Sequence, residues 1–188
     1  CSRLGDLDRH EATFLLKNAF NITKLNYFLR TAPCFLENET LEMFDETLHS
    51  SIQKILNVKM DDNTWRQASL PLCYGGLGIR KVSEVALPAF LASAHGSSDM
   101  VSLLNPTRMR EDPIAHLDTA VQMWSNFLAG SQGGDFPFKP SAQNLWDKPL
   151  CDLRHDSLLR ATTSEIELAC LKAVSAKHAS DWLKAYPV

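Results

Sequence analysis

The spacing of apolar residues predicts helices along most of the chain. The clearest pattern lies in residues 40–57, where apolar side chains recur every three or four positions and form one stripe. The stripe consists of Leu41, Phe44, Leu48, Ile52 and Ile55, and the opposite face carries Glu42, Asp45, Glu46, Gln53 and Lys54. Shorter stripes predict helices at residues 6–20 and 22–30. We therefore expect an all-α fold, a multi-helix bundle.

A pair of aspartates, Asp61 and Asp62, precedes the next predicted helix. Paired aspartates can hold magnesium ions beside phosphates, but these two lack the alternating apolar flanks of a β-hairpin. Aspartate is also a common residue at the start of a helix, where its side chain accepts a backbone hydrogen bond. The pattern favours a helix cap for a short helix that ends at Ser69.

A glycine-rich segment interrupts the helices at residues 70–79. It contains Pro71 and three closely spaced glycines, Gly75, Gly76 and Gly78. A long helix does not pass through such a segment, so we expect positive φ angles or a close approach to another element. The segment lacks the lysine and hydroxyl residue of a phosphate-binding P-loop, and we interpret it as a structural turn between helices.

Prolines and capping residues mark the helices of the second half of the chain. We expect Pro88 in the first turn of a helix or at a break, and Asp112-Pro113 and Pro149 at the starts of two further helices. Residues 97–111 read as a polar connection. Ser164 and Glu167 form a possible capping box before an apolar stripe. That stripe consists of Ile166, Ala169, Cys170 and Ala173.

Composition narrows the class of protein without giving a function. The chain has 188 residues, 45% hydrophobic and 22% charged, and a net charge of −3, which excludes wholesale disorder and a broadly basic nucleic-acid wrapper. Its five cysteines are widely spaced and predict neither a disulfide framework nor a thiolate zinc site. With no apolar run long enough to span a membrane, we expect no membrane contact and an intracellular location in cytoplasm or nucleus.

The candidate catalytic chemistry is sparse. The six histidines do not form a metal-binding spacing, and no nucleophile elbow is present, so we expect no catalytic residue, no metal site and no cofactor in this chain. A small hydrolase that uses the histidines is the least favoured hypothesis. Convergence of histidine and carboxylate side chains in a pocket would revive it.

Basic residues offer one hint of a partner. Lys17, Lys24, Arg30, Arg66, Arg80 and Lys81 would form a phosphate-facing patch if the fold brought them together. In that case Tyr27, Trp65 or Tyr74 would supply aromatic rings for stacking. The residues alone favour scattered, solvated charges instead, and both interpretations stay open at this point.

Several segments resemble the region that follows the polymerase core in non-LTR (LINE-type) retrotransposon reverse transcriptases. The most specific is residues 65–80, with the sequence Trp-Arg-Gln-Ala-Ser-Leu-Pro-Leu-Cys-Tyr-Gly-Gly-Leu-Gly-Ile-Arg. Residues 14–33 are similar to the segment where those proteins pass from the palm to the thumb, and residues 86–95 to the helix after the glycine turn. Residues 175–187 resemble a downstream Asp-Trp-Leu segment of animal relatives. Residues 100–164 are poorly covered.

The resemblance implies a domain organisation and a partner. It implies a thumb-like helical bundle at 1–69, a glycine turn with post-thumb helices at 70–130, a linker at 131–140 and a truncated helical segment at 141–188. The partner would be the template–primer, an RNA–DNA hybrid, contacted through its backbone by Lys17, Lys24, Arg30, Arg66 and Arg80. The catalytic aspartates and their magnesium would belong to the palm of the parent RNA-directed DNA polymerase, so the chain would be inactive alone.

Charge limits the strength of this expected binding. Residues 3–110 contain twelve basic and twelve acidic residues, and the remainder of the chain contains seven basic and ten acidic residues. We therefore expect the isolated chain to bind nucleic acid weakly, in the roughly 10⁻⁴ M range or weaker. The alternative function is a helical protein–protein interaction module without a role in nucleic-acid binding.

Overall fold

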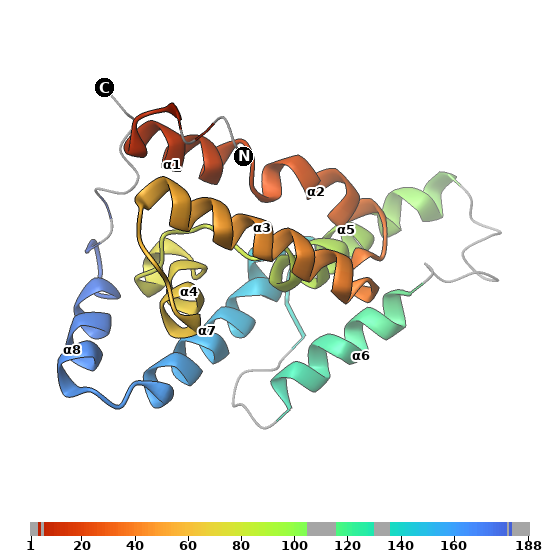
Figure 1. Cartoon of the computed structure of the whole chain (residues 1–188). Coiled ribbons are helices and arrows are strands. Elements are labelled where there is room, and N and C mark those ends of the chain that lie inside the picture. Colours follow the sequence, from red (N-terminus) through yellow and green to blue (C-terminus); the bar gives the residue numbers. More distant parts are fainter. Residues whose placement is uncertain (1–3, 5, 105–115, 130–135, 180, 182–188) are drawn as a thin grey trace. The chain divides into compact units, whose positions relative to one another are not determined.

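The computed structural model describes residues 4, 6–104, 116–129, 136–179 and 181, and these residues form an all-α protein (Figure 1). No β-strand occurs among the described residues, which confirms the predicted fold class. Within the same residues, no helix combines the length and the apolar character that crossing a membrane requires.

The first three helices follow the predicted apolar stripes. They are α1 (Arg9–Asn18), α2 (Ile22–Thr31) and α3 (Asn38–Leu56), and a short 3₁₀ helix, η2 (Cys34–Leu36), precedes α3. In the α3 stripe, Leu41, Leu48, Ile52 and Ile55 are buried and Phe44 is half-buried. The helical period of the sequence therefore identified the inward face of α3 correctly.

Asp45 departs from that pattern. It was predicted on the polar face of α3, yet only 6% of its surface is exposed. Its Oδ1 accepts a hydrogen bond of 2.6 Å from the backbone N–H of Val82, the first residue of α5 (Val82–Leu104). The N–H groups of a first helical turn have no partner within their helix, so Asp45 satisfies one of them from 37 residues away.

The helix cap predicted at the paired aspartates is confirmed. The helix α4 (Asp62–Ala68) begins after Asp61, whose Oδ1 accepts a hydrogen bond of 2.8 Å from the backbone N–H of Thr64. Trp65 and Ala68 are the buried residues of this short helix. Asp61 therefore serves as an N-cap.

Two proline predictions are wrong. Pro88 lies within α5 and Pro149 within α7 (Gln143–Ala161), and neither opens or interrupts its helix. Pro88 is almost completely buried, and Trp146, Leu150 and Cys151 around Pro149 are buried too. Close packing on these sides compensates for the backbone hydrogen bond that each proline removes, about 3 kcal/mol in an exposed helix interior.

Two further predictions in this half of the chain need correction or fall outside the described residues. Residues 97–104 belong to α5 and are not a connection. The next helix, α6 (Leu117–Leu128), begins after His116, and the predicted helix start at Asp112-Pro113 lies outside the described residues. His116 itself has a φ of 66°, which places it outside the regular helix.

The last helix, α8 (Glu165–Val174), begins as predicted but buries a different residue. Ser164 accepts a hydrogen bond of 3.4 Å from the backbone N–H of Glu167, as its capping role requires. Of the predicted stripe, Ile166, Ala169, Cys170 and Ala173 are all exposed, and Leu171 is the buried residue. In this short helix a single leucine makes the inward contact, so the sequence stripe pointed to the wrong face.

Packing divides the chain into two compact units. The first unit contains the described residues up to Lys24, Glu42–Val82, and those from Arg154 onward, and the second contains Leu25–Leu41 and the described residues of Ser83–Leu153. The units thus combine separated stretches of chain, whereas the segments predicted at 1–69, 70–130 and 141–188 are consecutive. Residues 131–135 of the predicted linker lie outside the described residues.

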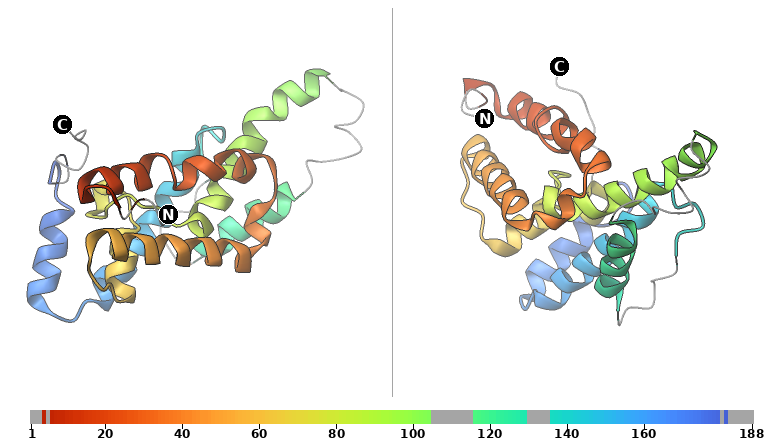
Figure 2. Two further views of the ribbon diagram at one scale, coloured as in Figure 1. Left: turned by 45° about the horizontal axis from the view of Figure 1, so that its top comes forward. Right: turned by 90° about the vertical axis from the view of Figure 1, so that its right-hand side faces the viewer.

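A small apolar cluster joins the glycine-rich turn to α7 and α8 in the first unit. Leu70, Leu158 and Leu171 are buried against one another, and Tyr74 and Leu159 pack against them. Figures 1 and 2 show α4 beside the C-terminal part of α7 and beside α8. Residues about one hundred positions apart in sequence therefore share this core.

The core of the second unit is aromatic. Trp124 and Trp146 are fully buried, with ring centroids 4.9 Å apart, and the Trp124 Nε1–H donates to the Trp146 carbonyl at 2.8 Å. The rings of His95 and Phe136 contact Trp146, and the Trp146 Nε1–H donates to the Pro140 carbonyl at 2.7 Å. These residues come from α5, α6, α7 and the segment before α7.

The predicted glycine turn is confirmed in its backbone geometry. The 3₁₀ helix η3 (Leu72–Tyr74) leads into Gly75, which has a φ of 75°, and Gly78 has a φ of 73°. The Pro71 carbonyl accepts hydrogen bonds from the N–H groups of Tyr74 and Gly76. A Cβ atom on Gly76 would stand 2.0 Å from the Leu70 carbonyl oxygen, so only glycine fits there.

Candidate functional site

Most of the basic residues predicted to contact nucleic acid belong to one unit. Lys17, Lys24, Arg66 and Arg80 lie in the first unit, and Arg30, in the last turn of α2, lies in the second. Lys24 is exposed, and the other four are half-buried. Of these predicted contact residues, those that can be compared within one unit are therefore Lys17, Lys24, Arg66 and Arg80.

Lys17 is brought to the glycine turn from a distant part of the sequence. A Cβ atom on Gly78 would stand 3.2 Å from the Lys17 Cε and 3.5 Å from its Nζ, so the lysine side chain of α1 lies along the turn. Arg80 follows Gly78 by two residues. Lys17 and Arg80 each have a further interaction partner within the chain. The fold thus places Lys17 against the glycine turn, and the chain continues from this turn to Arg80.

The other predicted cations have separate surroundings. The Arg66 Nη2 donates a hydrogen bond of 3.0 Å to the Ser157 hydroxyl of α7. The Lys24 ammonium lies 5.8 Å from the centroid of the Phe20 ring. Arg66 is thereby oriented by α7, and Lys24 lies near an aromatic ring of the connection between α1 and α2.

The aromatic residues proposed for stacking are arranged differently from the prediction. Trp65 is only 7% exposed, with the His49 ring stacked on it at 4.7 Å and the Lys81 ammonium 5.7 Å from its centroid. Tyr74 packs against the His155 ring at 5.4 Å. Tyr27 is exposed but belongs to the second unit. Trp65 is therefore a core residue, and Lys81, one of the basic residues of the predicted patch, lies near its ring.

His155 and Ser175 form a serine–histidine contact of the kind that some hydrolases use. His155 Nε2 lies 3.2 Å from the Ser175 hydroxyl, which also lies 2.7 Å from the Leu171 carbonyl and 3.0 Å from the Tyr74 carbonyl. The Ser175 hydroxyl has one proton and three neighbours that can accept it, the Leu171 and Tyr74 carbonyls and, in one tautomer, His155 Nε2. The two carbonyls compete with His155 for this proton, so we interpret the contact as a structural clamp between α8 and the glycine turn.

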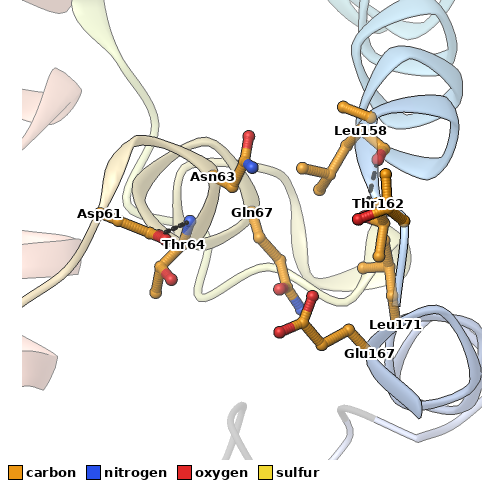
Figure 3. Close-up of a pocket in the computed structure, with 10 residues that line it drawn as sticks. Asp61, Asn63, Thr64, Gln67, Leu158, Thr162, Glu167 and Leu171 are labelled. Carbon is orange, nitrogen blue, oxygen red and sulfur yellow. Dashed lines mark hydrogen bonds between the residues drawn. The ribbon is translucent and has the colours of Figure 1, made fainter. Parts of the chain in front are cut away.

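A polar pocket lies between α4 and the α7–α8 connection in the first unit (Figure 3). Its volume is about 260 Å³. Side chains from three separated stretches of chain line it: Asp61, Asn63, Thr64, Gln67, Leu158, Ala161, Thr162, Thr163, Glu167 and Leu171. Sequence reasoning identified Asp61 as a cap but did not identify this pocket, because its walls are far apart in the chain.

The electrostatic character of this pocket is acidic. Hydrogen bonding from the Thr64 hydroxyl and then from its backbone N–H lowers the pKa of Asp61 below the usual value, so this carboxylate stays ionised at neutral pH. Glu167 supplies a second carboxylate, and no lysine, arginine or histidine among the described residues lines the pocket. Among the described residues, no group of three or more His, Cys, Asp or Glu side chains is placed to hold a metal ion.

Comparisons of this chain with models of protein families, with curated proteins and with solved structures found no match. The observations that bear on function are therefore the two features of the first unit described above. One is the contact of Lys17 with the glycine turn, and the other is the polar pocket.

Proposed function

We propose that this chain is the thumb and post-thumb part of a non-LTR retroelement reverse transcriptase and that it grips the backbone of the template–primer without taking part in the chemistry. The observation that carries the proposal is the position of Lys17 against Gly78, two residues before Arg80. Contacts to phosphates fix the register of a protein on a duplex and require cations on a defined backbone. The rigid glycine turn and α1 provide such a backbone, and the sequence of the turn is the segment that most resembles the family.

The expected mode of contact follows from the form of the duplex. An RNA–DNA hybrid is close to A-form, and its phosphates and wide minor groove are accessible, whereas its deep major groove is not. Lys17 and Arg80 would contact phosphates, with Arg66 and Lys24 as outer contacts. The net charge of −3 opposes tight binding, so grip by this part would add to that of the parent polymerase.

The direct test measures binding of the full chain to a fluorescently labelled RNA–DNA hybrid by anisotropy at several salt concentrations. The double variant Lys17→Gln/Arg80→Gln keeps most of each apolar stem and removes two charges. We expect weaker binding at low salt, and a slope of log K against log salt that falls by about two.

A matched control separates local contact from total charge. The double variant Lys54→Gln/Lys172→Gln removes the same charge from exposed positions in the same unit. We expect it to reduce binding much less. Equal losses in both double variants, or no binding of the unaltered chain at low salt, would overturn the proposal.

A second candidate function rests on a different observation. On α2 of the second unit, Tyr27 and Phe28 are 71% and 58% exposed, and their rings contact each other edge to face with centroids 5.7 Å apart. Adjacent exposed aromatic rings are typical anchors of protein interfaces. If Tyr27→Ala/Phe28→Ala abolishes binding to a co-purified protein while hybrid binding of the unaltered chain is absent, the interaction-module hypothesis replaces the first.

A further inference from the structure

The polar pocket of the first unit is separate from the residues used in the proposed function. None of Lys17, Lys24, Arg30, Arg66 and Arg80 lines it. Its lining includes two carboxylates, five other polar side chains that carry hydroxyl groups or a primary amide, and two buried leucines. A ligand for such a surface needs a group that donates hydrogen bonds and an apolar part.

Hydrogen bonds within the protein already use several donors of the pocket lining. The Thr162 hydroxyl donates to the Leu158 carbonyl at 2.9 Å, so its oxygen can only accept a further bond. The Gln67 Nε2 donates to the Gly75 carbonyl at 3.3 Å, which orients the amide and leaves its Oε1 as an acceptor. The backbone N–H of Thr64 donates to Asp61. The lining is therefore richer in acceptors than in donors.

The polar and the apolar parts of the lining lie on different sides of the pocket. Figure 3 shows the Gln67 side chain of α4 and the Glu167 side chain of α8 extending toward each other, with Leu158 and Leu171 at the α7–α8 side. Leu158 and Leu171 are 3% and 4% exposed, so they form a fixed apolar wall. Hydrogen bonds from Thr64 lower the pKa of Asp61, and Glu167 supplies the second carboxylate of the lining.

We propose that this pocket binds a primary alkylammonium group. The ammonium donates to the Glu167 carboxylate and the Gln67 carbonyl oxygen, and the alkyl stem lies on Leu158 and Leu171. Lysine-like groups combine an apolar stem with a cationic head that has three donors. The stem matches the leucines of the lining, and the head matches its acceptor side chains. The cavity volume of about 260 Å³ is smaller than that of pockets for drug-sized ligands, and it suits one such chain.

Two sources supply this chemistry, a free polyamine and a lysine side chain of another polypeptide. The experiment titrates the ¹⁵N-labelled full chain with 1,5-diaminopentane and with N-acetyl-lysine-N′-methylamide and follows the backbone amide shifts of Thr64, Gln67 and Glu167. We expect saturable shifts with a Kd in the millimolar range, about 1 to 10 mM. Tighter binding of 1,5-diaminopentane indicates a free polyamine, and tighter binding of the lysine derivative indicates a lysine side chain of another polypeptide. 1-Pentanol, which has the same stem without charge, is expected to cause no saturable shift.

Charge-removing variants then test the assignment of the head group. Glu167→Gln keeps the shape of the side chain, and we expect the Kd to rise roughly tenfold. Glu165→Gln is the matched control, because Glu165 is an exposed residue of the same helix turn that does not line the pocket, and we expect less than a twofold change. Asp61→Asn removes the second charge while asparagine still caps α4.

Three outcomes would overturn the proposal. They are the absence of saturable shifts with both amines, equal shifts with 1-pentanol, and equal effects of Glu165→Gln and Glu167→Gln. A thermal melt of each variant establishes that it folds. Since Lys17 and Arg80 do not line the pocket, loss of hybrid binding in their variants leaves amine binding intact, and the two proposals fail separately.

Discussion

Different kinds of contact stabilise the interior of each of the two units. In the second unit, Trp124 and Trp146 are completely buried and contact each other, and His95 and Phe136 pack against Trp146. Around the glycine turn of the first unit, the contacts are a backbone approach at Gly76, side-chain hydrogen bonds of Ser175 to two carbonyls, and a small cluster of leucines. The second unit gains stability from apolar area, and the turn gains a defined shape from close backbone contacts.

This difference bears on where function is found. In the aromatic core each indole N–H donates to a backbone carbonyl, and His95 Nε2 is the buried polar atom without a hydrogen-bond partner among the described residues of that core. A turn built from glycines and local hydrogen bonds leaves room at its surface for a charged side chain, here Lys17. The polar pocket beside α4 lies in the same unit. The residues with candidate functions therefore concentrate in the first unit.

Removal of the central ring of the aromatic core is expected to have the largest effect. Trp146→Ala deletes a side chain with no exposed surface that contacts Trp124, His95 and Phe136. We expect the free energy of unfolding to fall by about 3 to 5 kcal/mol, measured by urea denaturation. Phe127→Ala on α6 is the control, because this ring is 61% exposed and should change the value by less than about 0.5 kcal/mol. Similar losses in both variants would contradict the aromatic core.

Addition of one methyl group at the turn is expected to have the next largest effect. Gly76→Ala would place a Cβ atom 2.0 Å from a backbone oxygen, so the turn must shift, and we expect a loss of about 1 to 3 kcal/mol. Gly96→Ala in α5 is the matched control, because its Cβ atom would meet Ser141 Cβ at an ordinary 3.4 Å. Helix propensity predicts a gain of about 0.5 to 1 kcal/mol there. Thermal or urea unfolding of both variants gives the comparison, and a neutral Gly76→Ala would show that the turn is not rigid.

Loss of the Ser175 hydroxyl tests the clamp between α8 and the turn. Ser175→Ala removes the hydrogen bonds to the Tyr74 and Leu171 carbonyls and the contact with His155. We expect a destabilisation of about 1 kcal/mol, since a net hydrogen bond contributes about that much. The Ser157 hydroxyl accepts from Arg66 at an exposed position, so Ser157→Ala should cost less. Hydrolysis of an ester substrate that depends on Ser175 would contradict its assignment as a clamp.

The sequence predicted local features well and features that depend on distant packing poorly. The α3 stripe and the Asp61 cap are local, and each was identified correctly from neighbouring residues. Pro88 and Pro149 satisfy the local rules for a helix start, but they lie within helices, Pro88 buried and Pro149 beside buried residues of α7. Ile166 and Leu171 show the same limit, since a helix of ten residues carries too few apolar positions to identify its inward face.

The site was harder to predict than the fold. Lys17 was among the predicted cations, but its contact with Gly78 joins residues 61 positions apart, and no periodicity indicates such a pair. Asp45 looked like a surface residue because its partner, the Val82 N–H, belongs to another helix. The pocket combines three stretches of chain, and its acceptor-rich character arises from hydrogen bonds that exist only in the folded protein.

The smallest expected effect concerns the pH dependence of the aromatic core. His95 stacks on Trp146 at 5.4 Å, and its Nε2 is buried without a hydrogen-bond partner among the described residues. Burial therefore lowers the pKa of His95 below its usual value of 6.5 in the folded protein. Because the unfolded chain takes up this proton at a higher pH than the folded one, the contribution to stability is complete above about pH 6.5 and is lost as the pH falls below it.

The variant His95→Phe isolates this contribution, because phenylalanine retains a ring against Trp146 and cannot take up a proton. Urea denaturation at pH values between about 7.5 and 5 should show a smaller loss of stability on acidification in His95→Phe than in the unaltered chain. His10→Gln removes an exposed histidine from α1 and should leave the original slope unchanged. If the slopes of the unaltered chain and His95→Phe are equal, the ring of His95 accepts a proton in the folded state as readily as in water. The burial of His95 would then have no effect on its protonation, and the contrast between the aromatic core of the second unit and the polar surroundings of the glycine turn would have to be given up.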